Sequence, residues 1–282
     1  MKNLKTESKI QKTCLKEKDN VQDWADKTIN IYKGCSNNCR YCYARGEAVR
    51  FKRVKKEDWT TEILNQEKVK KGWMLSKKNI MFSSTHDITP GTYDACEIVL
   101  KKVLEAGNTV LIVSKPRADL IAKLCDALES YKNQILFRFT IGAQDDALLS
   151  FWEPTAPVYE DRREALKIAH EKGFNTSVSL EPMLDPANIE NLIEDLRDFT
   201  TDSMWVGTMN MIGKRVEIDS EKVEEEIGKI EAGQTPEKLM AIYDKFKNDP
   251  LIKWKGHVRK ILKKLGIEVS EQKDDWRERI GN

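Results

Sequence analysis

The sequence predicts an α/β fold, built as a partial (β/α)6 barrel with a helical C-terminal extension. Six short runs rich in β-branched and aromatic residues alternate with amphipathic stretches, and turn residues separate the two kinds of segment. A row of β-then-α units favours a parallel sheet with helices outside it. Six such units, rather than the eight of a closed barrel, predict an open barrel. No further strand is expected after residue 214.

The expected strands are each about five or six residues long, which distinguishes them from buried helical turns. They are Thr28–Tyr32, Asn79–Ser84, Thr109–Ser114, Ile135–Thr140, Thr176–Leu180 and Ser203–Gly207. We divide the chain into a peripheral segment (residues 1–26), the barrel core (27–213) and the extension (214–282). The chain of 282 residues suits one large domain of this kind.

The expected helices show apolar residues at a spacing of three and four. Thr92–Ala106 follows Pro90-Gly91, carries one apolar stripe, and ends at Gly107. The others are Arg117–Ser130, Arg162–Lys172, Ile189–Phe199, Lys222–Glu231, Pro236–Lys247 and Ile252–Leu265. Cys96 and Cys125 fall on apolar helix faces, where we expect them to pack in the core.

The composition is that of an ordinary globular protein, with 40% hydrophobic and 33% charged residues. It excludes a disordered tail, a collagen-like chain and a disulfide scaffold. No stretch approaches the ~18–20 apolar residues of a membrane span, and the N-terminus lacks the apolar core of a secretory signal. We therefore expect a cytoplasmic protein with no membrane partner, whose cysteines are thiols or metal ligands.

Charge is distributed unevenly along the chain, although its net value is +2. Residues 45–78 hold 11 Lys/Arg and five Asp/Glu, residues 181–237 hold 15 acids and five bases, and residues 238–264 hold nine bases and two acids. Such runs are typical of solvated helix faces. They are also typical of the rim of a site for a polyanion such as nucleic acid. Charge alone leaves both interpretations open.

Three cysteines, Cys35, Cys39 and Cys42, lie within eight residues directly after the first expected strand. Thiolates at this spacing converge when a loop wraps around a group that they all bind. Zinc sites are usually built from two paired cysteine knuckles, and no second knuckle is present. An iron–sulfur cluster held by three thiolates keeps one iron open for chemistry. The spacing therefore favours a cluster over zinc.

This motif, followed by repeated βα units, resembles the radical S-adenosylmethionine (SAM) superfamily. Within it, the chain most resembles the branch that contains spore photoproduct lyase and related DNA repair photolyase-type proteins. The resemblance covers about Ile29 to Met211. It is carried by the stretches GCSNNCRYCYA, FSSTHDITP, VLIVSKP, WEPTAPVYEDRREALKIAHEKG and SVSLEPMLDP.

The resemblance implies a [4Fe–4S] cluster on Cys35, Cys39 and Cys42, whose fourth iron is chelated by the amino and carboxylate groups of SAM. Reductive cleavage of SAM then yields a 5′-deoxyadenosyl radical, which takes a hydrogen atom from the substrate. The implied partners are an electron donor such as flavodoxin or ferredoxin and, as the candidate substrate, nucleic acid. The sequence assigns no catalytic side chain and no oligomeric state.

The same resemblance places the methionyl end of SAM at the ends of two strands. Asp87 would contact the amino group, with His86 beside it as a cofactor contact or a supporting one. Ser114 and Lys115 would approach the carboxylate, where a cation is electrostatically favourable. The alternatives are that Asp87 caps the next helix and that Lys115 is a surface residue.

Four more residues are implied as cofactor contacts. Thr140 would lie near the ribose or methionyl end, Gly142 would give the adenine close access to the backbone, and Tyr43 would pack by the adenosyl group. Glu181 would bind cofactor or substrate, or pair with Arg138 inside the barrel. Trp152 and residues 153–163 resemble a family connector, for which packing is the expected role.

One position departs from spore photoproduct lyase. Ser84 stands where that enzyme has a cysteine that returns a hydrogen atom to the product radical. A serine O–H bond is too strong for that role, so the sequence does not predict thymine-dimer reversal. The main prediction is a radical SAM enzyme of unknown substrate. The alternatives are a spore photoproduct lyase-like DNA repair lyase with a different hydrogen donor, and a non-catalytic zinc- or cluster-stabilised binding module.

Overall fold

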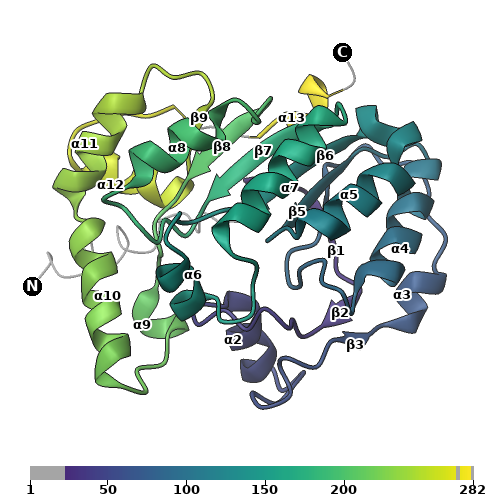
Figure 1. Ribbon diagram of the computed structural model, residues 1–282, viewed down its shortest axis with the longest axis horizontal. Helices are drawn as coiled ribbons and strands as arrows, with labels where there is room; N and C mark the ends of the chain where they lie inside the picture. The colour runs from purple at the N-terminus through teal and green to yellow at the C-terminus, as the bar shows by residue number, and fades with distance from the viewer. Residues whose placement is uncertain (1–22, 271–273, 281–282) are drawn as a thin grey trace, which may run out of the picture.

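A computed structural model describes residues 23–270 and 274–280. Its main sheet has seven strands, each parallel to its neighbours, in the order β1-β4-β5-β6-β7-β8-β9. The strands are β1 Lys27–Ile29, β4 Ile80–Phe82, β5 Val110–Ser114, β6 Ile135–Thr140, β7 Asn175–Leu180, β8 Ser203–Val206 and β9 Ile252–Trp254. Figure 1 shows this sheet with helices around it. The fold is a partial, TIM-barrel-like α/β barrel, as expected.

Helices cover the outside of the sheet, with α4 toward one end of the row and α10 and α11 toward the other (Figure 1). The longer helices are α4 Tyr93–Glu105, α5 Ala118–Ala127, α7 Tyr159–Glu171, α8 Ile189–Arg197, α10 Glu221–Gly233, α11 Pro236–Phe246 and α12 Gly256–Lys264. The shorter elements are α2 Tyr43–Arg50, α3 Gln66–Lys70, η1 Glu129–Gln134, α6 Asp146–Trp152, α9 Ile212–Arg215 and α13 Trp276–Arg279. Cys96 in α4 and Cys125 in α5 are buried in the core, as expected.

The seventh strand, β9, corrects the prediction of six strands and of a strandless extension. It occupies Ile252–Trp254, which the sequence analysis had assigned to the start of a helix, and it pairs with β8 from Met204↔Ile252 onward. Ile252 and Trp254 are buried while Lys253 is half-buried, so the segment has the period of two that defines a strand. The helix begins only at Gly256.

The first expected strand is shorter than predicted. β1 ends at Ile29, and the chain then forms β2 (Tyr32–Lys33), which pairs in the antiparallel sense with β3 (Ile63–Leu64) in a separate sheet. Cys14 and most of the segment 1–26 lie outside the described residues. Trp24 and Ala25, however, are buried in the barrel interior, so at these two positions that segment is not peripheral.

The barrel interior contains an arginine, Arg138, with no exposed surface. Its guanidinium is 2.7 Å from Asp274 and 3.7 Å from Asp202, and it faces the rings of Trp24 and Trp205. Arg138 therefore does not pair with Glu181, which had been the alternative role for that residue. No described helix is long and apolar enough to cross a membrane.

Candidate active site

A cavity with about 1100 Å³ of free space, its open mouth included, lies at the carboxyl ends of the strands, where barrel enzymes bind their ligands. Side chains from the cysteine loop and from several strand ends line it together. The lining includes these residues singled out by the sequence: Cys35, Cys39, Cys42, Tyr43, His86, Asp87, Lys115, Thr140 and Glu181.

The cysteine loop is held close to a neighbouring segment by Gly34. This glycine has φ +93°, and a Cβ there would lie 2.5 Å from the Trp59 carbonyl oxygen and 2.3 Å from that of Thr61. Glycine alone tolerates both conditions. The N–H of Cys35 donates to the Trp59 carbonyl at 2.9 Å, so the first thiol of the loop is placed by backbone contacts.

Cys42 is the N-cap of α2, and its Sγ accepts a hydrogen bond from the Arg45 N–H at 3.4 Å. The positive end of a helix dipole favours a thiolate. Burial nevertheless raises the pKa of all three thiols, that of Cys39 to about 12, where the Lys115 ammonium opposes the effect. In the metal-free chain the thiols are therefore protonated, and a bound metal would deprotonate them.

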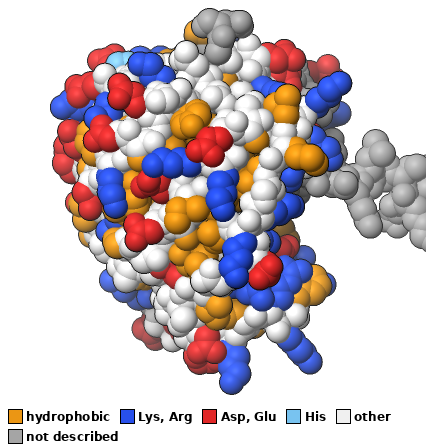
Figure 2. All heavy atoms as spheres, turned by 90° about the vertical axis from the view of Figure 1, so that its right-hand side faces the viewer, with side chains coloured by type: hydrophobic (Ala, Val, Ile, Leu, Met, Phe, Trp, Pro, Cys, Tyr) orange, Lys and Arg blue, Asp and Glu red, His pale blue; other side chains and the backbone are white. Residues whose placement is uncertain are grey.

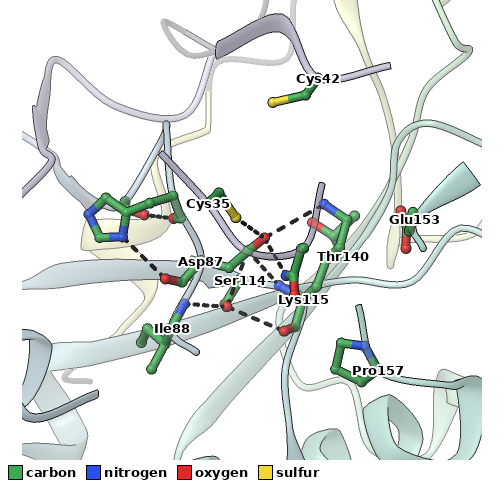
Figure 3. A network of polar contacts seen from close by, with 12 residues as sticks. Cys35, Cys42, Asp87, Ile88, Ser114, Lys115, Thr140, Glu153 and Pro157 are labelled. Carbon is green, nitrogen blue, oxygen red and sulfur yellow. Dashed lines mark hydrogen bonds and ion pairs between the residues drawn. The ribbon is translucent and has the colours of Figure 1, made fainter. Parts of the chain in front are cut away.

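The donor set fits a cluster better than a single ion. Within residues 23–270 and 274–280, no three His, Cys, Asp or Glu side chains are grouped to hold one metal ion. The three thiols instead line one cavity together, and in Figure 3 Cys42 stands apart from Cys35. A cubane presents its irons at separate corners, so its thiolate ligands need not meet at one point.

Asp87 and Lys115 form a pair of opposite charges at this cavity (Figure 3). The Lys115 Nζ lies 3.9 Å from Asp87 Oδ2, which also accepts from Asn37 Nδ2 at 2.8 Å and lies 3.7 Å from the Cys35 Sγ. Asp87 Oδ1 accepts from the Lys115 N–H at 2.8 Å and from the Ser114 hydroxyl at 3.2 Å. Burial acts to raise the pKa of Asp87, but the Lys115 ammonium and these donors outweigh it and hold the pKa below its ordinary value.

Ser114 supports Asp87 and does not line the cavity itself. Its hydroxyl accepts from the Ile88 N–H at 3.0 Å while donating to Asp87. The alternative role of Asp87 as a helix cap is not observed, because the N-cap of α4 is Thr92. Asn37, fully buried beside Asp87, was missed by sequence reasoning. The only signal for it was its position between Cys35 and Cys39.

His86 lines the cavity, but both of its ring nitrogens are engaged by the backbone. Nε2 accepts from the Ile31 N–H at 3.1 Å, and Nδ1 lies 3.2 Å from the Asp87 carbonyl oxygen. Because an N–H only donates and a carbonyl only accepts, the imidazole is neutral with its proton on Nδ1. Burial also lowers the pKa of His86, which favours the same neutral form. Its polar atoms therefore fix the loop rather than reach a ligand.

Three other predicted contacts are placed differently from one another. Thr140 ends β6 and lines the cavity. Tyr43 also lines the cavity, and its hydroxyl donates to the Ser84 carbonyl. Gly142 is not part of the lining: a Cβ there would lie 2.5 Å from the Pro182 carbonyl oxygen. Close packing against residues 182–184 explains this glycine, so the expected approach to the adenine has no support at this position.

Glu181, which the sequence predicts as a contact, lies beside cavity residues that sequence reasoning missed. Glu181 lies 3.3 Å from the Nζ of Lys255, which follows β9 and is fully buried, and 3.8 Å from His257. A Cβ at Gly207 would come within 2.9 Å of both Glu181 and Lys255, so this glycine makes room for the pair. Arg215 and Thr208, which sequence reasoning also missed, line the cavity as well. Recognition of β9 would have been the signal for Lys255.

Comparisons with known proteins agree with this architecture. A sequence profile of the radical SAM superfamily matches residues 29–199. The uncharacterized protein ORF301 of Acidianus two-tailed virus is 30% identical over an alignment of 239 residues, and the match covers 73% of this chain and 77% of that protein.

Among solved structures, SuiB is similar to this chain in fold. Streptococcus suis SuiB bound to precursor peptide SuiA matches 87% of this chain with a TM-score of 0.52 and 15% identity. The chain spans about half of SuiB, 53% of its length. Spore photoproduct lyase complexed with dinucleoside spore photoproduct matches 64% of this chain and 54% of its own with a TM-score of 0.46 and 16% identity.

Proposed function

The chain belongs to the radical SAM superfamily, whose enzymes use SAM and an iron–sulfur cluster, and we propose that it holds a [4Fe–4S] cluster on Cys35, Cys39 and Cys42. The observation that carries the proposal is that three thiols and one pair of opposite charges, Asp87 and Lys115, face the same cavity. Cluster and SAM together supply one-electron cleavage of a carbon–sulfur bond and hydrogen-atom abstraction.

In this proposal Asp87 and Lys115 hold the two ends of the methionyl zwitterion. The carboxylate of Asp87 accepts from the ligand ammonium, and the Lys115 ammonium donates to the ligand carboxylate. Their separation of 3.9 Å is long for an ion pair, and their side chains keep 15% and 12% exposure on the cavity. A zwitterionic ligand therefore gains two charge-assisted bonds, each of roughly 1.5–3 kcal/mol, while disturbing only a loose contact.

Tyr43, Thr140 and Glu181 line the remaining wall and would enclose the adenosyl group. The cavity reaches into the barrel as far as Trp24 and Met81, and such apolar walls would shield a reactive radical from water. The described residues that line it include no cysteine other than the three of the loop. Ser84 lines the cavity without a thiol, which supports a reaction other than thymine-dimer reversal.

We further propose that the substrate is nucleic acid, and that a carrier such as flavodoxin or ferredoxin supplies the electron. The helix α2 is capped by Cys42 and ends at Arg50, and the exposed turn that follows it contains Lys52, Arg53, Lys55 and Lys56. In Figure 2, basic and hydrophobic side chains gather toward the lower right of the face shown. A basic surface next to the cysteine loop suits a phosphate backbone.

Anaerobic reconstitution tests the cluster and the reaction. We expect about four iron and four sulfide per chain and dithionite-dependent formation of 5′-deoxyadenosine. Cys39→Ala should abolish both. Cys96→Ala should retain them, because Cys96 is buried on α4 and does not line the cavity. Full cluster content and SAM cleavage in Cys39→Ala would contradict the proposal.

Salt-dependent binding tests the substrate. We expect affinity for single- or double-stranded DNA or for RNA to fall steeply with salt, and Arg50→Gln/Arg53→Gln to weaken it. Lys264→Gln, an exposed lysine at the end of α12, is the control. Equal binding by the double variant and the control would remove the basic turn from the proposal.

A further inference from the structure

The connector after β6, for which the sequence predicts only packing, is bonded to the middle of the cysteine loop. The N–H of Arg40 donates to the Trp152 carbonyl at 2.8 Å, and its side chain Nε donates to the Phe151 carbonyl at 2.9 Å. The Tyr41 hydroxyl donates to Glu153 Oε1. Tyr41 lies between Cys39 and Cys42 and lines the cavity. The connector therefore holds the loop at the residues between two of its thiols.

Glu153 is in turn paired with Arg162 of α7, and both are buried, with 1% and 0% exposure. The remaining donors of Arg162 reach the Pro157 carbonyl at 2.8 Å and the Thr140 carbonyl at 3.3 Å. A continuous series of bonds thus joins the cysteine loop to the end of β6. A buried ion pair is weak evidence for stability, because desolvation offsets its attraction. Its presence here calls for another explanation.

The position of this pair gives it electrostatic influence on the loop. Glu153 accepts a hydrogen bond from the hydroxyl of Tyr41, which lies between Cys39 and Cys42 in the sequence, so the charge of Glu153 lies beside the loop. The ring of Tyr41 in turn lies 5.8 Å from the Lys115 Nζ, and both residues line the cavity. Charges interact strongly in such a low-dielectric interior. Glu153 and Arg162 are thus opposite charges acting on one face of the loop.

We propose that the Glu153–Arg162 pair, acting through Tyr41, positions the cysteine loop and sets how readily the iron–sulfur group held there accepts an electron. The inference rests on the proposed function. Net charge, hydrogen bonding and burial are the means by which a protein tunes such a group. Because reduction adds negative charge, loss of the carboxylate should favour it and loss of the guanidinium should disfavour it.

The test is a redox titration of the reconstituted cluster, followed by electron paramagnetic resonance without SAM. Glu153→Gln should shift the midpoint potential to a more positive value, and Arg162→Gln to a more negative one. The double variant should return toward the wild-type value, because its net charge is unchanged. Glu160→Gln on the same helix, whose carboxylate is 71% exposed, is the control and should leave the potential unchanged.

Tyr41→Phe separates positioning from charge. It keeps both charges and removes the hydrogen bond between the cysteine loop and Glu153. The midpoint potential should therefore move less than in Glu153→Gln, while iron is released to a chelator several-fold faster than in wild type. Thermal unfolding of each variant identifies any that fails to fold. Glu153→Gln and Tyr41→Phe conserve side-chain shape and suffice if the arginine variant is lost.

Two results would overturn the inference. One is a Glu153→Gln potential equal to that of Glu160→Gln, and the other is a shift of the same sign in both single variants, which indicates structural damage only. A wild-type protein that holds no cluster would instead refute the proposed function. A wild-type protein that holds a cluster and cleaves SAM, with Glu153→Gln and Tyr41→Phe indistinguishable from it, would refute the present inference alone.

Discussion

Two charged clusters lie inside the same barrel and differ in what surrounds them. Toward the amino ends of the strands, Arg138 donates to Ser177, Asp274 and Ser203, and has no exposed surface. Toward the carboxyl ends, the Lys115 ammonium approaches the Asp87 carboxylate only to 3.9 Å, and both side chains retain contact with a cavity. The first cluster is saturated by the protein itself, whereas the second keeps binding capacity for a ligand.

The contrast shows that burial and ion pairing alone do not mark a functional site. Arg138 is the more deeply buried of the two cations, and the protein itself supplies a hydrogen-bond partner to each of its guanidinium nitrogens. A ligand site requires polar atoms that are held in place and still face free space. Lys115 meets that condition and Arg138 does not, although both come from neighbouring strands of one sheet.

The largest effect is expected from breaking the saturated cluster. Asp274→Ala removes the closest partner of Arg138, and the loss of one member of a buried pair costs about 3–5 kcal/mol. Denaturant unfolding should show this decrease in the free energy of unfolding. Asp275→Ala, at the exposed neighbouring position, is the control. An Asp274→Ala protein as stable as this control would mean that the arginine cluster is not structural.

A smaller effect is expected at the cluster that faces the cavity, and on a different property. Lys115→Ala and Asp87→Ala should each weaken SAM binding roughly ten- to a hundredfold, which corresponds to one or two factors of ~1.4 kcal/mol. Iron content should stay intact, because neither residue belongs to the cysteine loop. Calorimetric titration of the reconstituted variants measures their affinity for SAM. Wild-type affinity in both variants would show that the methionyl group does not bind between Asp87 and Lys115.

The smallest effect concerns His86, which borders the cavity yet behaves like the saturated cluster. Burial lowers its pKa from the ordinary value of 6.5. Below pH 6.5 the imidazole is therefore protonated more readily in the unfolded chain than in the folded one. Its stabilising contribution is therefore complete above pH 6.5 and decreases as the pH falls below it, by at most ~1.4 kcal/mol per pH unit. Unfolding at pH 7 and pH 5 measures the decrease, which should be smaller in His86→Gln. An equal decrease in both proteins would refute it.

Local patterns explain most of what could be predicted. Five- and six-residue apolar runs such as Ile135–Thr140 are long enough to be recognised as strands. The three cysteines of the site lie within eight residues, so their spacing is visible in the sequence. β9 has only three residues, too few for the pattern to compete with the helix that follows. Lys255, placed by β9, was missed for the same reason.

Other features depend on contacts that no local pattern contains. Arg138 requires a carboxylate, but Asp274 lies 136 residues farther along the chain, and Glu181 was the nearer choice in sequence. Gly142 illustrates a related difficulty: a glycine beside a site serves equally for ligand access or for packing, and only the position of Pro182 decides between them.

The burial of Trp276 beside Trp24 has a consequence for folding kinetics. The Trp276 Nε1 donates to the Trp24 carbonyl at 2.8 Å, across 252 residues of sequence. Contacts of such separation form late and slow the folding reaction. During synthesis the N-terminal strands emerge first, and Arg138 stays without Asp274 until nearly the whole chain has left the ribosome. Truncation before residue 274 should therefore leave a chain that collapses with a buried arginine that lacks its closest carboxylate and retains only Asp202 at 3.7 Å, and such a chain is a candidate substrate for chaperones.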